Sequence, residues 1–347
     1  MQVPETTDAP GSIPADDGTA SGAGAAETET AGACRPWRWA LVAGKVALIA
    51  LVLLLVGRHV YANWSRLAAR DWDLRPGAMI LAFGAFLIAL FYRGGIWYLQ
   101  VRNTHLCPPK WPTIAGDLVA KLGTYLPGKV WAVLGRAYFL SRNTSISMLS
   151  ASAFSTVSQV CIIVAGAACG LLAAPLLVPA GYGWIMAASG LICLSGLVFV
   201  AAPRFFAGFA DRALGLIGRG PMKVDMSSSQ LAWWITLSIS SVLLSGLTFA
   251  LFVATFQPIG LGDIASLVGC FALAGVAGLL AFFAPGGLGV REGVIMVVLT
   301  PMMGPETAIV VSLAYRLWLT LGQLTCAGIG LVILKRMAIP LPNERNH

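Results

Sequence analysis

Long apolar runs alternate with short polar stretches over most of the chain, and this pattern predicts membrane-spanning helices. A helix needs about 20 predominantly apolar residues to cross the hydrocarbon core of a bilayer. Runs of about that length lie near 39–56, 77–100, 148–178, 182–202, 231–256 and 306–335. The pattern therefore predicts an all-α polytopic membrane protein with about six full spans.

Two further apolar units, about 113–140 and 264–303, are interrupted by a Pro-Gly break. The arms of the first unit are about 11–14 residues long, which is too short to cross a bilayer, and we interpret the second unit as short-armed as well. Proline removes a backbone donor and glycine weakens a helix, so each break ends one helix and precedes another. We expect two broken or re-entrant helical hairpins; the alternative is a bundle of eight or more spans.

The two breaks resemble each other in sequence. LPGKVWAV at 126–133 can be aligned with APGGLGVR at 284–291, and each break has a full span before and after it. The unit about 77–178 therefore matches the unit about 231–335. Three spans separate the hairpins, which places them on opposite membrane faces. This is the inverted-repeat pattern of many transporters, in which the binding site lies where the repeats meet.

The second break is unusually polar for its surroundings. APGGLGVREG at 284–293 carries Arg291 and Glu292 beside four glycines. Charged side chains at membrane depth are costly unless they face protein, water or a polar ligand. We expect this stretch to form part of a binding site. A structural ion pair within the hairpin is the alternative interpretation.

Composition agrees with a membrane protein, since 57% of residues are hydrophobic and 11% are charged, against about 45–50% and roughly 25% in soluble domains.

The domains expected are a disordered acidic tail at 1–36, a transmembrane domain at 37–336 and a short tail at 337–347. The chain after residue 34 carries 23 basic and 9 acidic residues. Basic loops indicate a multi-pass protein of the plasma membrane with cytoplasmic termini, although the outer loop 57–76 is also basic.

Several classes of chemistry are not expected. Seven cysteines without a CxxC pair and three scattered histidines predict neither a metal site nor a cofactor. The sequence shows no basic stripe interleaved with aromatic residues, so nucleic-acid binding is not expected. We expect Arg93 to reach a membrane interface, and Asp117 and Asp263 to cap helices or lie at the surface.

The chain resembles the transmembrane, flippase-like domain of bacterial lysylphosphatidylglycerol synthases. The resemblance rests on PGGLGVRE at 285–292, YRLW at 315–318, and LPGK at 126–129 followed by Arg136 and LSRNTSIS at 140–147. It covers roughly residues 40–335. Many relatives have a glutamate shortly after the first Pro-Gly, where this chain has Trp131 and Ala132. The chain resembles a stand-alone member without the soluble aminoacyl-transfer domain, so we expect no enzyme activity.

The resemblance implies a flippase that moves an anionic phospholipid or lipid-linked headgroup between leaflets. The substrate-binding residues expected are Pro127, Gly128, Lys129, Arg136, Pro285, Gly286, Gly287, Gly289, Arg291, Glu292 and Arg316. Helix N-termini and cationic side chains would receive the phosphate. Two alternatives remain open: a membrane scaffold for a separate lipid-modifying enzyme, and an integral-membrane transferase acting on lipid-linked sugars. The sequence fixes neither the lipid nor the oligomeric state.

Overall fold

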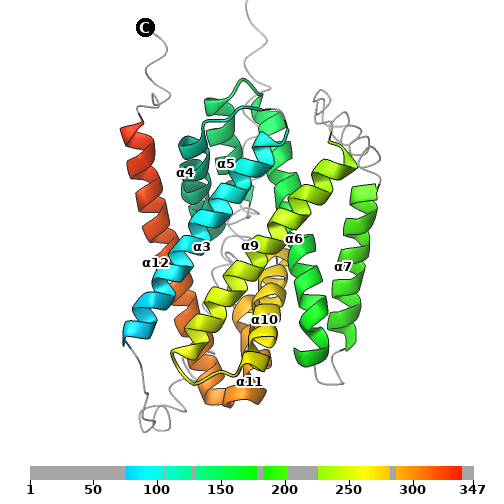
Figure 1. The fold of residues 1–347 in the computed structure, drawn as a ribbon, viewed down its shortest axis with the longest axis vertical. Coiled ribbons are helices and arrows are strands. Elements are labelled where there is room, and N and C mark those ends of the chain that lie inside the picture. The colour runs from blue at the N-terminus through cyan, green and yellow to red at the C-terminus, as the bar shows by residue number, and fades with distance from the viewer. Residues whose placement is uncertain are drawn as a thin grey trace, which may run out of the picture. The chain divides into compact units, whose positions relative to one another are not determined.

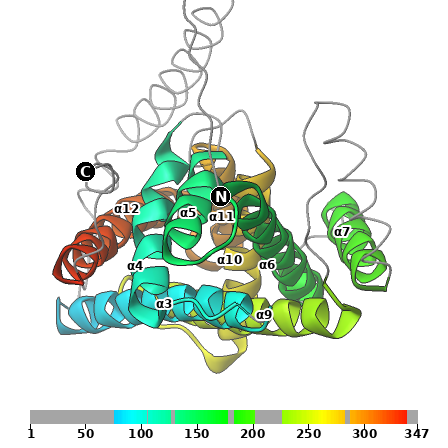
Figure 2. The same ribbon diagram turned by 90° about the horizontal axis from the view of Figure 1, so that it is seen from above.

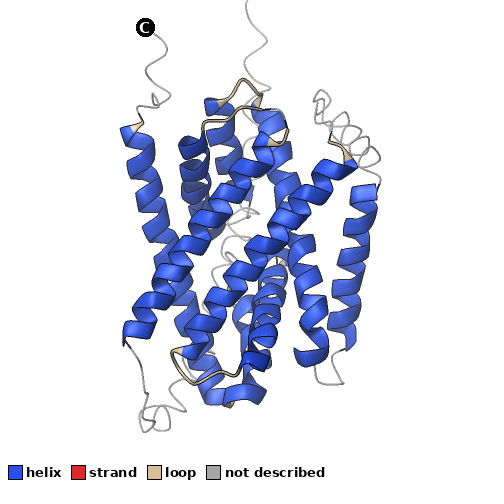
Figure 3. Cartoon of the chain, viewed as in Figure 1, coloured by secondary structure: helices blue, strands red, loops and turns tan. Residues whose placement is uncertain are grey.

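A computed structural model describes residues 76–104, 106–126, 130–177, 183–201, 226–281 and 287–337. Every regular element in these ranges is a helix (Figure 3). In chain order the helices are α3 (Pro76–Arg102), α4 (Lys110–Ala120), η1 (Lys121–Tyr125), α5 (Val130–Asn143), α6 (Met148–Leu177), α7 (Gly183–Ala201), α9 (Ser228–Ala254), α10 (Leu261–Leu280), α11 (Val290–Met303) and α12 (Pro305–Arg336). The predicted acidic tail, the first span near 39–56 and the residues after 337 lie outside the described ranges.

The long helices have the length and the surface of membrane spans. Helices α3, α6, α9, α10 and α12 are each long and apolar enough to cross a bilayer. Large apolar side chains point outward from several of them; Leu81, Leu172 and Leu317 are 71%, 83% and 74% exposed. Lipid tails, rather than water, suit such a surface. The prediction of an all-α polytopic membrane protein is confirmed.

Two helical hairpins enter the bundle from opposite ends (Figure 1). Helices α4 and α5 descend from the end at which α12 finishes and return to it, whereas α10 and α11 begin and end at the other. The Gln257 side-chain amide, just before α10, donates to the Met302 carbonyl at the end of α11, which holds both ends of the second hairpin together. Its first arm is longer than expected: α10 has 20 residues, enough by length alone for a span. The chain nevertheless turns back, because glycines and a proline follow α10.

The two halves match each other as an inverted repeat. Helices α3 and α9 both contain 27 residues and run in opposite directions, and α5 and α11 both contain 14. The packing partners correspond as well: α4 contacts α3, α5 and α12, and α10 contacts α9, α11 and α6. Seen along the bundle, α3 and α9 lie along one side of the hairpins, between α12 and α6 (Figure 2).

Glycines allow the hairpins to approach their neighbouring helices closely. Gly94 of α3 faces Ile114 of α4, and Gly246, at the same position in α9, faces Val268 of α10. A Cβ at either glycine would lie 3.1 Å or less from the facing side chain. Small residues are typical of such close contacts between membrane helices. Both hairpins are therefore pressed against the α3–α9 pair at equivalent places.

Candidate functional site

The second hairpin carries a buried acid–base pair at the start of α11. Glu292 lies in the first turn of α11, and one of its carboxylate oxygens accepts the Gly289 N–H at 2.7 Å. The other oxygen lies 3.5 Å from the Arg316 guanidinium of α12, and both side chains are almost completely buried. A carboxylate near a helix N-terminus is stabilised by the free N–H groups there. The chain thus supplies its own anion to the helix start at which we expected a lipid phosphate.

The glycines of the second break have specific conformational roles. Gly287 and Gly289 adopt φ values of 71° and 83°, which residues with a side chain rarely adopt. A Cβ at Gly287 would lie 2.9–3.2 Å from the backbone of Gly278 in α10. The break therefore needs glycine for its turn and for contact between the two arms.

Arg291 points to aromatic rings rather than to a carboxylate. Its guanidinium lies 5.3 Å from the Phe271 ring centroid and 5.6 Å from that of Tyr315. The Arg291 Nε and the Tyr315 hydroxyl are both buried, and neither has a hydrogen-bond partner within the described ranges. Cation–π contacts of this kind stabilise a cation by about 2 kcal/mol or more when they are shielded from water. The aromatic rings therefore compensate the Arg291 charge in part, while its Nε has no hydrogen-bond partner among the described residues.

Arg316 connects the two hairpins. Its guanidinium pairs with Glu292 of the second hairpin and also lies 5.8 Å from the ring centroid of Tyr125, at the end of η1 in the first. The Tyr125 hydroxyl donates to the Gln323 side-chain oxygen of α12 at 2.7 Å. Two segments about 170 residues apart in the sequence are therefore joined through one face of α12.

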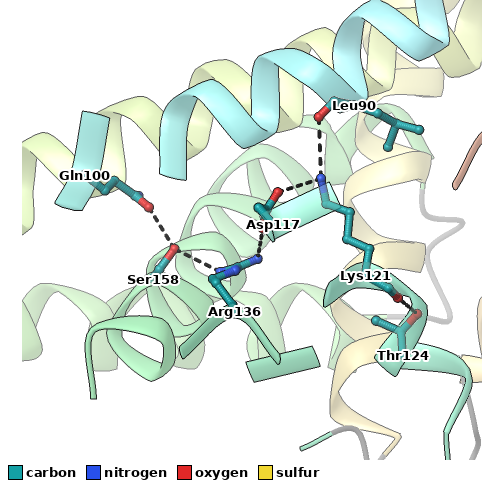
Figure 4. Close-up of polar contacts among 7 residues, drawn as sticks. All are labelled: Leu90, Gln100, Asp117, Lys121, Thr124, Arg136 and Ser158. Atoms are coloured by element: carbon teal, nitrogen blue, oxygen red, sulfur yellow. Dashed lines mark hydrogen bonds and ion pairs between the residues drawn. The ribbon is translucent and has the colours of Figure 1, made fainter. Parts of the chain in front are cut away.

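The first hairpin contains a second charged cluster, centred on Asp117 of α4 (Figure 4). The Asp117 carboxylate is fully buried and lies 2.8 Å from the Arg136 guanidinium of α5 and 2.9 Å from the Lys121 ammonium. Lys121 also donates to the Leu90 carbonyl of α3 at 3.4 Å. The Arg136 guanidinium packs on the Trp97 ring, 4.9 Å from its centroid. One carboxylate therefore holds two cations between α3, α4 and α5.

A chain of polar side chains continues from this cluster to α9. Arg136 lies 3.5 Å from the Ser158 hydroxyl of α6, which itself donates to the Gln100 side-chain oxygen of α3 at 2.7 Å. The Gln100 amide donates to the Trp234 carbonyl and to Ser238. Gln100, Ser158 and Ser238 are all buried, so this network lies inside the bundle.

The structure brings together Arg291, Glu292 and Arg316 with Gly287 and Gly289, and places the expected Arg136 in the other cluster. The expected residues Pro127, Gly128, Lys129, Pro285 and Gly286 lie outside the described ranges.

Two expectations about single residues were wrong. Asp117 is neither a helix cap nor at the surface: it is 1% exposed in the middle of α4, because Lys121 and Arg136 compensate its charge. It supplies a carboxylate to the first hairpin, which has no glutamate after its Pro-Gly break. Arg93 does not extend to an interface; it lines an internal cavity beside Arg136 and is close enough to Asp117 and Arg291 to interact electrostatically. Asp263 lies in the first turn of α10, which begins at Leu261, and its carboxylate accepts the Gly260 N–H at 2.8 Å.

Sequence reasoning missed the cluster as a unit, although one signal was present. The spacing of Asp117 and Lys121 places them on one face of a helix. Arg93 and Gln100 lie on α3 and Ser158 lies on α6, and nothing in the sequence indicates that these two helices would face the same space.

Cations outnumber carboxylates inside the bundle. Among the described residues, five interior cations (Arg93, Lys121, Arg136, Arg291 and Arg316) face two interior carboxylates (Asp117 and Glu292). In these ranges no group of histidine, cysteine or acidic side chains has the arrangement of a metal site. The interior therefore suits an anion rather than a metal ion.

A family comparison shows which family the chain belongs to. Residues 42–327 match the family described as the lysylphosphatidylglycerol synthase TM region. The chain belongs to this family. The match contains both hairpins and extends beyond Arg316, so the two charged clusters lie within the family domain. Among curated proteins and solved structures, nothing matches the chain.

Proposed function

We propose that this protein is a flippase-like carrier that moves the headgroup of an anionic phospholipid between the two leaflets. The observation that supports this most is the excess of three positive charges inside the described bundle, five cations against two carboxylates. An anionic headgroup loses its hydration on entering a bilayer and needs compensating charge there. Arginine suits this task because its planar guanidinium can donate two parallel hydrogen bonds to a phosphate.

The position of the clusters supports a path between the leaflets. The first hairpin holds Arg136 and Lys121, and the second holds Arg291 and Glu292. Because the hairpins enter from opposite ends (Figure 1), each cluster belongs to a hairpin that would be entered from a different leaflet. Arg316 contacts both hairpins and would receive the phosphate between them.

The charges at the two ends of the bundle support an orientation. Arg102, Lys110, Arg142, Lys335 and Arg336 lie at the end at which α12 finishes, whereas Asp263 and Glu306 lie at the other. Cytoplasmic segments carry an excess of Lys and Arg. We therefore place the α12 C-terminus and the first hairpin at the cytoplasmic face of the plasma membrane.

A lipid-exchange assay tests the proposal. The purified protein would be reconstituted in vesicles that contain fluorescent phosphatidylglycerol, and the fraction that a membrane-impermeant reductant can bleach would be followed over time. We expect the wild type to expose inner-leaflet phosphatidylglycerol and to move a zwitterionic analogue more slowly. Arg316→Ala and Glu292→Ala should reduce exchange at least tenfold.

The matched control is Arg336→Ala, which removes an exposed arginine from the end of the same helix. It should exchange lipid at the wild-type rate. Normal exchange by both the Arg316→Ala and the Glu292→Ala proteins, correctly folded by gel filtration and thermal unfolding, would contradict the proposal.

A further inference from the structure

A cavity beside the Asp117 cluster has an unusual lining. It lies between α3, α5 and α6 and is lined by Arg93, Trp97, Gln100, Arg136, Ser158 and Gln159. We call it the Arg93 cavity. The space left between these side chains is close to that of a single water molecule. Any occupant in this conformation is therefore small.

The hydrogen-bond acceptors around the Arg93 cavity are already used. Ser158 donates to the Gln100 side-chain oxygen at 2.7 Å, which satisfies that acceptor. The Asp117 carboxylate holds Arg136 and Lys121 at 2.8 and 2.9 Å.

The donors are not all used. The Arg136 Nε and the Gln159 side-chain nitrogen are buried and have no partner in the described part of the chain. Arg93, which is half-buried, also forms no ion pair or hydrogen bond with a described residue, although it lies in the electrostatic field of Arg136 and Asp117. Buried polar groups almost always have a partner. Each unpartnered group at this cavity is an N–H donor, so the missing partner is an acceptor.

The local charge distinguishes an anion from a water molecule. Arg93, Lys121 and Arg136 face Asp117 alone, which leaves an excess of two positive charges among the described residues. Arginine cannot lose its proton in a protein, so the two guanidinium groups cannot be neutralised by deprotonation. A water molecule would accept hydrogen bonds but would leave the charge uncompensated in a medium of low dielectric constant.

We propose that the Arg93 cavity is a binding site for a small monovalent anion of the chloride class. Arg93, the Arg136 Nε and the Gln159 amide donate to it, and the Trp97 ring closes one side. A lipid phosphate with its four oxygens is too large for the space in this conformation. The site is thus additional to the proposed lipid path, and its test measures binding and not transport.

Thermal stability in different salts tests the site. The full chain, purified in nanodiscs, would be unfolded in potassium chloride and in potassium gluconate at equal ionic strength. Because a ligand that binds only the folded state stabilises it, chloride should raise the wild-type Tm by several degrees in a saturable manner. Arg93→Met, which removes the charge but keeps the volume, should lose this increase. Arg102→Met, at the exposed end of the same helix, should keep it.

The stability of the variant in gluconate separates a ligand site from a structural role. If Arg93 leaves an uncompensated charge when no anion is bound, Arg93→Met should be at least as stable as the wild type in gluconate. A structural arginine would instead lower the Tm in both salts. That result, or equal wild-type Tm values in the two salts, would overturn the proposal.

A second variant and a direct measurement cover the case in which Arg93→Met does not fold. Gln159→Met removes one donor at nearly constant volume. It should weaken chloride binding about tenfold, as expected for the loss of one hydrogen bond to a charged group. The affinity would be measured by calorimetric titration of potassium chloride into the protein in gluconate. Unchanged affinity in Gln159→Met would count against the site. Titration of inorganic phosphate should give no heat of binding at the same concentrations; stabilisation by phosphate that chloride cannot displace would show a different ligand and overturn the assignment.

Discussion

Substitution of Asp117 by asparagine should strongly destabilise the protein while changing almost no volume. The Asp117 side chain is fully buried and is the only described carboxylate in contact with Lys121 and Arg136. Without it, Lys121 and Arg136 of the first hairpin and Arg93 of α3 would lie inside the bundle with no described counter-charge. Breaking a buried ion pair by removing one partner costs about 3–5 kcal/mol. We expect Asp117→Asn to lower the free energy of unfolding by that amount.

The measurement is unfolding by sodium dodecyl sulfate in mixed micelles, followed by circular dichroism. Asp117→Asn combined with Lys121→Met should recover part of the loss, because one of the uncompensated cations is then removed. Asp263→Asn is the matched control: the Asp263 carboxylate lies in the first turn of α10, where the loss of its charge should cost less than about 1 kcal/mol. An Asp117→Asn protein as stable as the wild type, or a double variant no better than the single one, would refute the reasoning.

Two further predictions concern the second hairpin and the orientation. Gly287→Ala should destabilise the protein by about 1–3 kcal/mol, because φ is positive there and a Cβ would meet the Gly278 backbone. The control is Gly293→Ala in α11, where a Cβ would have no atom of a neighbouring residue within 4 Å. It should be neutral or stabilising in the same unfolding assay. Cys107, the exposed cysteine between α3 and α4, should react with an impermeant maleimide only from the cytoplasmic side in a Cys34→Ser background, and labelling of intact cells from outside would reverse the proposed orientation.

The sequence was sufficient to predict the class of fold because hydrophobic length is a strong signal. A bilayer requires about 20 apolar residues per span and excludes open backbone, so the spans and the two breaks could be recognised one by one. The entry of the two hairpins from opposite membrane faces could also be predicted, since three spans separate them in the sequence. The sequence analysis underestimated the length of the first arm of the second hairpin. Helix α10 is as long as a span, and only its position in space shows that the chain turns back.

Substrate binding by the charged residues of the second hairpin stays a prediction, but the structure shows how these residues are grouped. Arg291, Glu292 and Arg316 were expected as a group because two are adjacent and the third lies in a recognisable YRLW segment, and the structure places Glu292 and Arg316 in one ion pair. Asp117 and Arg93 were misinterpreted because side-chain direction depends on packing. A lone charge in an apolar helix can extend to an interface or face inward, and only the neighbours that it meets decide between these.

The contact of Arg316 with both hairpins has a mechanical consequence. A single guanidinium cannot approach Tyr125 and Glu292 more closely at the same time, since they lie on segments that come from opposite membrane faces. An anion that draws the Arg316 side chain toward one hairpin must weaken its contact with the other hairpin. We therefore expect the positions of the two hairpins to be coupled through this one side chain.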